Sequence, residues 1–182
     1  MIGLSRRAFI VGLGAVAAAP GAALAHPHPV AAPRVVGFRT RAAPGSIVVR
    51  TAERRLYFVL GRGQAVEYVI GVGRAGRSFR GSGTIARKAK WPRWTPTRNM
   101  IRREPHKYAR FAGGVPGGPG NPLGARALYL YRGGRDTMYR IHGTSDPSSV
   151  GRAVSNGCIR LLNAHVEDLY DRTRIGARVY VQ

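Results

Sequence analysis

Hydrophobic residues gather in short runs from residue 46 onward, and these runs predict β-strands. The first three cover residues 47–49, 56–60 and 66–72. Turn residues such as Gly61 and Gly63 separate them, and β-branched and aromatic side chains are frequent within them, as is typical of strands. The pattern therefore predicts a β-meander at the start of a domain.

The hydrophobic period changes in the last third of the chain. Two strand-like runs flank the Gly133–Gly134 turn, and another follows a helical pattern. These strands are expected at residues 127–131, 138–142 and 178–181. Apolar positions from Val166 to Thr173 recur at helical spacing, with Asn163 as a candidate N-cap. One main α-helix is therefore expected among the strands.

Two stretches show neither period, and we expect long loops there. Residues 73–110 hold both tryptophans, Trp91 and Trp94, among prolines and basic side chains. In residues 113–122, Gly and Pro occupy eight of ten positions. Long ordered loops in a compact domain usually carry function. Since no repeat or domain break follows residue 46, the expected fold is a single, mainly β domain with one main helix.

The charge of the chain is extreme. Lys and Arg number 30 against 8 Asp and Glu, so the formal net charge is +22, and 27 of the 30 cations are arginines. Because 44% of the residues are hydrophobic, this is not the composition of a disordered polybasic chain. A folded protein with this charge favours a polyanionic partner: nucleic acid, an anionic membrane surface or an anionic envelope polymer. The arginine excess either serves paired contacts with carboxylates and phosphates or reflects biased codon usage.

The first 25 residues have the layout of a cleaved export signal. Arg6 and Arg7 precede an apolar run over residues 8–19, and small residues end the segment at Ala25. The flanking residues resemble the twin-arginine motif, which directs folded proteins across a bacterial inner membrane; a general secretory signal with two chance arginines is the alternative. The run is shorter than the ~20 residues that span a bilayer, so no stable membrane anchor is expected.

Export sets the expected domain boundaries and the compartment. After the signal at 1–25, residues 26–45 are rich in Pro and Ala and are expected to form a flexible leader. A single domain is expected over residues 46–182. The mature protein would then lie in the periplasm, which makes nucleic acid an improbable partner.

A lone cysteine, Cys158, is unusual for an exported protein, because cysteines in oxidising compartments normally pair. It is either buried and inert or needed for its chemistry. His142, at the end of a predicted strand, could act as its base if two adjacent strands bring them together. Gly157 permits a tight turn that would leave backbone N–H groups facing a carbonyl oxygen, and Arg160 could hold a substrate carboxylate.

These residues form part of a motif that resembles a known family. Ile141–Thr144 and Ser155–Leu161 look like the signature of the L,D-transpeptidase catalytic domain (YkuD-like), which acts on bacterial peptidoglycan. Residues 121–130 and Trp94–Thr97 resemble other segments of that family, and the resemblance extends over residues 46–182. It implies a β-sandwich or partly closed sheet with long loops and one main helix.

The resemblance also implies roles for individual residues. Cys158 would be the nucleophile, His142 its base, and the backbone carbonyl of Gly143 the group that orients the imidazole. The residues expected to bind substrate are Arg160, Ser155, Asn156 and Gly157. Asn156 departs from the histidine that many members have at this position, which puts a role for a second imidazole in doubt.

The implied activity is cleavage of the L,D peptide bond in a tetrapeptide stem through a thioester. The acyl group would pass to a second stem peptide or to an outer-membrane lipoprotein, and carbapenems would be inhibitors. An L,D-carboxypeptidase on the same fold and a non-catalytic, basic envelope-binding protein remain alternatives. Loops in residues 73–122 could exclude water from the thioester. Because metal-binding and phosphate-binding signatures are absent from the sequence, we expect no cofactor.

Overall fold

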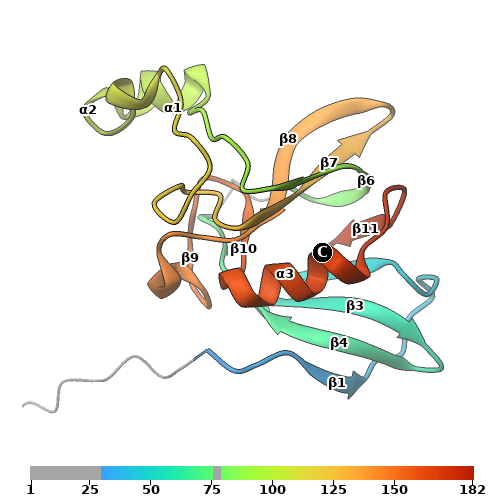
Figure 1. Ribbon diagram of the computed structural model, residues 1–182. Helices are drawn as coiled ribbons and strands as arrows, with labels where there is room; N and C mark the ends of the chain where they lie inside the picture. Colours follow the sequence, from blue (N-terminus) through green and yellow to red (C-terminus); the bar gives the residue numbers. More distant parts are fainter. Residues whose placement is uncertain (1–29, 76–78) are drawn as a thin grey trace, which may run out of the picture.

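A computed structural model describes residues 30–75 and 79–182, and the predicted export signal lies outside these residues. In the described part of the chain, nine strands form one mixed sheet in the order β1-β4-β3-β2-β11-β6-β7-β8-β10, and β5 and β9 form a small second sheet (Figure 1). The strands are β1 Arg34–Gly37, β2 Ile47–Arg50, β3 Arg55–Gly61, β4 Gln64–Val69, β5 Val72–Gly73, β6 Gly81–Lys90, β7 Arg126–Arg132, β8 Arg135–His142, β9 Ala153–Ser155, β10 Ile159–Arg160 and β11 Arg178–Val181.

Helices are few and mostly short. The main helix is α3, Asn163–Arg172, which packs against β7 and β8. Two short helices, α1 (Arg98–Arg103) and α2 (Pro105–Tyr108), lie in the connection between β6 and β7. Single 3₁₀ turns form at Ala109–Phe111 and Pro147–Ser149. No helix within residues 30–75 and 79–182 has the length and apolar content needed to cross a membrane.

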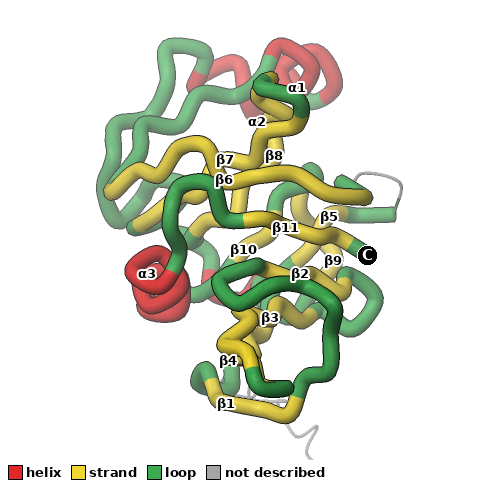
Figure 2. Tube along the Cα trace, turned by 90° about the vertical axis from the view of Figure 1, so that its right-hand side faces the viewer, coloured by secondary structure: helices red, strands yellow, loops and turns green. Residues whose placement is uncertain are grey.

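The sheet curls so that its two halves enclose a common core. Ile47, Leu56 and Val66 come from β2, β3 and β4, and they belong to the same buried cluster as Leu128 and Ile141 from β7 and β8. Figure 2 shows the strands following one another from β7 and β8 at the top to β1 at the bottom, with α3 to one side. The expectation of a mainly β, partly closed sheet with one main helix is confirmed.

A backbone contact joins the turn after β4 to β10, although these lie far apart in the strand order. The N–H of Gly71 donates to the carbonyl oxygen of Arg160 (2.8 Å), and the N–H of Arg160 donates back (2.9 Å). A Cβ on Gly71 would lie 2.5 Å from the carbonyl oxygen of Ser149, closer than real Cβ contacts. Only glycine therefore fits between the Ser149 carbonyl and β10 at this position.

Most strands lie where the hydrophobic runs predicted them, but residues 73–110 are not all loop. Residues 81–90 form the ten-residue strand β6, which pairs with β7 and β11. Its pattern is obscured because Arg87 and Lys88 occupy the strand and only Gly83 and Ile85 are buried. The Arg87 guanidinium lies over the Tyr129 ring, 4.4 Å from its centroid. A basic side chain therefore packs against β7 at a position where the usual strand pattern has an apolar one.

Two further expectations differ from the structure. Residues 34–37, assigned to a flexible leader ending at residue 45, form β1 antiparallel to β4. An apolar run of only Val35 and Val36 is too short to identify a strand, but the edge of β4 supplies hydrogen-bond partners. Asn163 is not the N-cap of α3; Leu162 holds that position, and Asn163 is the first residue of the helix. Its side chain serves the site described below.

Lys88 connects β6 to the end of α3. Its Nζ donates to the carbonyl oxygens of Tyr170 and Thr173, both at 2.6 Å, and lies 4.0 Å from the centre of the Tyr170 ring. The last carbonyls of a helix have no partner within it, and a cation there also matches the helix dipole. Partial burial lowers the pKa of Lys88, because it disfavours the charged form.

We expect Lys88→Met to lower the free energy of unfolding by about 1–3 kcal/mol, because two carbonyls lose a charged donor while the aliphatic stem is retained. Chemical denaturation measures this change. Lys90→Met, on the exposed end of the same strand, is the matched control. Equal stability of the two variants would show that Lys88 does not stabilise the end of the helix.

Candidate active site

Parallel pairing of β8 with β10 places the predicted catalytic residues on one face of the sheet. Ile159 pairs with Ile141, and Arg160 pairs with His142. Side chains of paired residues in adjacent strands point to the same side, and successive residues alternate. Since Ile141 and Ile159 face the core, His142 and Arg160 face away from it. Alternation places Cys158, next to Ile159, on that same outer face.

The Cys158 thiol lies half-buried against β8. Its Sγ donates to the carbonyl oxygen of Met138 over 3.9 Å, and no hydrogen bond joins the thiol to His142 within the described part of the chain. Burial raises the pKa of Cys158, while a backbone hydrogen bond at Arg140 and the charges of Arg140 and Arg160 oppose this effect. The resting group is therefore a neutral thiol at pH 7.

His142 is buried, with 4% of its surface exposed. Its Nδ1 lies 2.6 Å from the carbonyl oxygen of Gly143, which assigns the proton of the neutral ring to Nδ1 and the lone pair to Nε2. Burial lowers the pKa of His142 to about 4, and the Arg160 charge adds to this effect. The side chain is thus a neutral base at pH 7, oriented by Gly143 as the resemblance implies.

Ser155 and Gly157 shape the turn that carries Cys158. The Ser155 hydroxyl donates to the carbonyl oxygen of Cys158 (2.7 Å) and accepts from the Gly157 N–H (3.0 Å). Gly157 has a φ of 136°, which favours glycine. The Gly157 amide is thereby occupied, whereas the Cys158 amide makes no hydrogen bond in the described residues. The Cys158 N–H is thus the amide at this turn that can face an oxyanion.

Arg160 presents an unpaired positive charge beside His142. The residue is half-buried, and its Nε is buried without a hydrogen-bond partner. Its guanidinium has no ion pair among residues 30–75 and 79–182. An uncompensated guanidinium in this position can bind a carboxylate by a paired contact.

Asn156, also expected to bind substrate, contacts the protein itself. Its Nδ2 donates to the Tyr108 hydroxyl (3.0 Å), and its Oδ1 accepts from Arg74 (3.1 Å). The structure therefore brings Cys158, His142 and Arg160 to one face of the sheet and sets the Gly143 carbonyl against the His142 ring. Ser155, Asn156 and Gly157 make contacts within the loop and with its neighbours.

The sequence analysis missed the role of Asn163. Its Oδ1 accepts hydrogen bonds from the N–H groups of Ala125 (3.0 Å) and Thr144 (3.1 Å). Ala125 directly precedes β7, and Thr144 directly follows Gly143. A Cβ on Gly143 or Gly124 would lie 2.2 Å from this oxygen. Asn163 thus holds the Gly143 carbonyl where it can orient His142. Gly124 and Gly143 are visible in the sequence as candidates for close backbone contacts. That both lie against Asn163 depends on the fold and cannot be seen in the sequence.

Arg140 was also missed, because its contacts depend on a bulge in β8. Asp136 accepts two hydrogen bonds from its guanidinium, at 2.7 and 2.8 Å. The same group lies 4.4 Å from the centre of the Tyr129 ring. Asp136 also accepts from the N–H of Met138, whose φ is 62°. The contacts of Asp136 with Arg140 and Met138 therefore stabilise the bulge, which presents the Met138 carbonyl to the Cys158 thiol.

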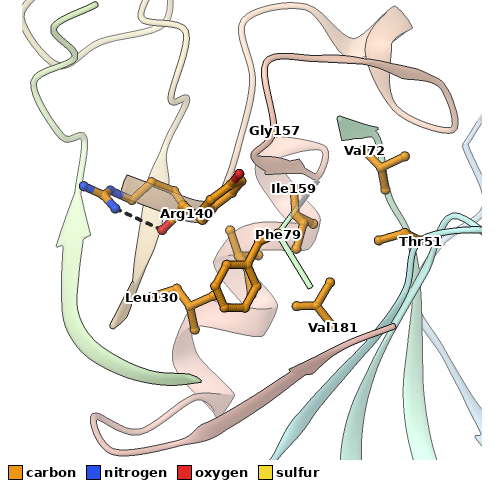
Figure 3. Close-up of a pocket in the computed structure, with 10 residues that line it drawn as sticks. Thr51, Val72, Phe79, Leu130, Arg140, Gly157, Ile159 and Val181 are labelled. Carbon is orange, nitrogen blue, oxygen red and sulfur yellow. Dashed lines mark hydrogen bonds between the residues drawn. The ribbon is translucent and has the colours of Figure 1, made fainter. Parts of the chain in front are cut away.

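A small, mostly apolar cavity lies on the core side of β8 and β10, opposite the face that carries Cys158. Figure 3 shows Phe79, Leu130 and Val181 projecting toward one another there, with Gly157 and Ile159 at its border. Most of its lining is apolar, with Thr51 and Arg140 also at its border. Within the described residues, no group of three or more His, Cys, Asp and Glu side chains could hold a metal ion.

The lone thiol allows a direct test of its protonation. We expect the rate of carboxamidomethylation of Cys158 by iodoacetamide to rise continuously from about pH 5 to about pH 10, because the raised pKa keeps the thiol neutral over most of this range. Intact mass spectrometry measures the rate. A plateau between about pH 5 and pH 8 would instead indicate a thiolate–imidazolium pair and contradict the neutral pair.

Comparison with known proteins agrees with this geometry. The family model of the L,D-transpeptidase catalytic domain (YkuD) matches residues 44–181. A relative from Escherichia coli strain K12, described as a probable L,D-transpeptidase ErfK/SrfK, is 40% identical over 138 residues, which are 74% of this chain and 43% of that protein. The chain spans less than half the length of this relative and of a second one from the same strain, described as a probable L,D-transpeptidase YbiS.

Solved structures share the fold. One from Brucella melitensis, described as a probable carnitine operon oxidoreductase, is 49% identical with a TM-score of 0.59, covering 82% of this chain and 92% of that one. L,D-transpeptidase 3 from Mycobacterium tuberculosis, in complex with a faropenem-derived adduct, is 18% identical with a TM-score of 0.53, covering 75% and 59%. That second likeness concerns the fold alone. By its family model and its relatives, the chain belongs to the L,D-transpeptidase catalytic domain family.

Proposed function

We propose that the chain is a peptidoglycan L,D-transpeptidase that uses Cys158 as its nucleophile. The observation that carries the proposal is the common outer face of β8 and β10, on which alternation places the thiol, the neutral imidazole of His142 and the unpaired guanidinium of Arg160. A nucleophile, a base and a carboxylate-binding group are what acyl transfer from a peptide stem needs. The family match supports the same reaction class.

In the first step, Nε2 of His142 takes the proton of the Cys158 thiol as Sγ attacks the carbonyl between meso-diaminopimelate and the terminal D-alanine. The Cys158 N–H stabilises the oxyanion. The C–N bond then breaks, His142 gives its proton to the departing amine, and a thioester remains. The Gly143 carbonyl accepts from Nδ1 throughout, which stabilises the imidazolium while it exists.

In the second step, an amine attacks the thioester. His142 removes a proton from this amine and returns it to the sulfur as the new amide forms, so the thiol is restored. The acceptor amine belongs to a second stem peptide in crosslinking or to an outer-membrane lipoprotein in anchoring. Water in place of the amine gives a trimmed stem.

Substrate binding would use the charges beside the thiol. Arg160 would hold a carboxylate of the stem, because among the described residues its guanidinium has no counter-ion and its Nε no hydrogen-bond partner. Exposed cations of the connection between β6 and β7 would attract the acidic cell-wall polymer. They are Arg93, Arg98, Arg102, Arg103, Lys107 and Arg110.

The proposed location is the periplasm. The signal-like segment at residues 1–25, with Arg6 and Arg7, favours export by the twin-arginine route. This location places the enzyme beside its proposed substrate.

The reaction is tested with tetrapeptide muropeptides and the mature chain, with products identified by mass spectrometry. We expect crosslinked dimers from the wild type and at least about a thousandfold less product from Cys158→Ala, because the acyl intermediate cannot form. Tripeptides without dimers would indicate a carboxypeptidase. Equal turnover in Cys158→Ala would exclude the thiol mechanism, and the absence of any product would favour a non-catalytic envelope-binding protein.

Carbapenems are expected to acylate the same residue, since their strained carbonyl accepts a thiol nucleophile as the stem does. A solved structure of L,D-transpeptidase 3 from Mycobacterium tuberculosis contains a faropenem-derived adduct, so another β-lactam reacts with that protein. Intact mass should show one adduct on the wild type, none on Cys158→Ala and at least about tenfold slower formation on His142→Ala. Acylation of His142→Ala at the wild-type rate would remove His142 from its role as base.

A further inference from the structure

We propose that Asn156 is a positioning residue that holds α2 against the nucleophile loop, residues 156–158 between β9 and β10. By doing so, it favours transfer of the acyl group to an amine over hydrolysis of the thioester. The inference rests on the proposed function, because it concerns the fate of the thioester. It gives Asn156 a role other than substrate binding.

The carboxamide of Asn156 joins three segments next to the thiol. Asn156 precedes Cys158 by two residues, and its Nδ2 donates to the Tyr108 hydroxyl at 3.0 Å. Its Oδ1 accepts from Arg74, at the end of the β5 segment, at 3.1 Å. Arg74 also lies 3.6 Å from Glu104, the residue between α1 and α2. A single side chain thus connects the nucleophile loop to both neighbouring segments.

The segment on the other side of this contact is well packed. Tyr108 is buried, with 8% of its surface exposed, and its ring centre lies 6.3 Å from that of Trp94. Trp94 in turn packs edge-on against Phe111 and exchanges two backbone hydrogen bonds with Val115, at 3.0 and 2.7 Å. These contacts pack residues 94–115 of the connection between β6 and β7 together, and the bond to Tyr108 ties this packed segment to the loop that carries Cys158.

A carboxamide suits this position because it supplies a donor and an acceptor together. A neutral imidazole also supplies one of each. Alanine supplies neither. Asn156→Ala therefore removes both bonds, Tyr108→Phe removes the bond to α2 alone, and Asn156→His offers a conservative rescue.

The contact has a chemical consequence because the thioester reacts with either an amine or water. A packed segment held beside the nucleophile limits the access of water. Loss of the bond lets the segment separate from the loop, and the fraction of acyl-enzyme that water resolves rises. The first step depends on His142 and changes less.

The experiment measures the ratio of tripeptide to crosslinked dimer formed from tetrapeptide muropeptides. We expect Asn156→Ala and Tyr108→Phe to raise this ratio about three- to tenfold, as the loss of one or two hydrogen bonds would produce. Asn156→His should restore it to within about twofold of the wild type. The matched controls, Asn99→Ala on the exposed side of α1 and Tyr180→Phe on β11, should leave it unchanged.

A second readout is independent of turnover. In a Trp91→Phe background the fluorescence comes from Trp94, so acrylamide quenching reports how well its segment stays packed. We expect quenching to increase in Asn156→Ala and in Tyr108→Phe, but not in the two controls. Thermal unfolding confirms that each variant is folded, and Tyr108→Phe still provides the test if Asn156→Ala is not.

The outcomes separate the inference from the proposed function. An unchanged product ratio in Asn156→Ala and Tyr108→Phe, with a wild type that makes dimers, overturns the inference alone. So does an equal rise in the controls, or a higher ratio in both variants without increased quenching. A wild type that makes no dimers overturns the proposed function, while quenching still decides whether Asn156 holds the segment.

Discussion

The register between β8 and β10 is the constraint on which the site depends. Fifteen residues separate His142 from Cys158. Only the pairing of Arg160 with His142 in this register brings the histidine and the cysteine to neighbouring positions on one face. A shift of one residue would turn Ile159 outward and the thiol toward the core. The bond pair between Gly71 and Arg160 holds β10 from the other side, so the short strand cannot slide without breaking contacts across the curled sheet.

Electrostatic balance follows from this placement. Burial first, and then the charges of Arg160 and Arg140, lower the pKa of His142 and keep the imidazole neutral and able to accept a proton. Asp136 compensates one of them, Arg140, whereas Arg160 keeps its charge available. The site thus combines a neutral base with one uncompensated cation. This combination suits a substrate that carries carboxylates but reacts at a neutral amide.

Sequence reasoning identified the residues whose chemistry is intrinsic and missed those whose role depends on contacts. Cys158 and His142 could be singled out because a lone cysteine and a motif histidine are visible in one dimension. Asn163 looked like a helix cap, since nothing local shows that its oxygen accepts from Ala125 and Thr144. The strand β6 was read as loop because cation–π stacking and helix capping employ its long basic side chains, which hides the alternating pattern.

The position of β11 has a consequence for the order of folding. This strand, formed by residues 178–181, lies between β2 and β6 and pairs with both, so it joins the two halves of the sheet. Each half can pair locally, but the common core closes only when β11 joins them, because β2 and β6 meet through this strand. Closure of the core therefore requires contacts between segments far apart in the sequence, and it follows the local pairing within each half.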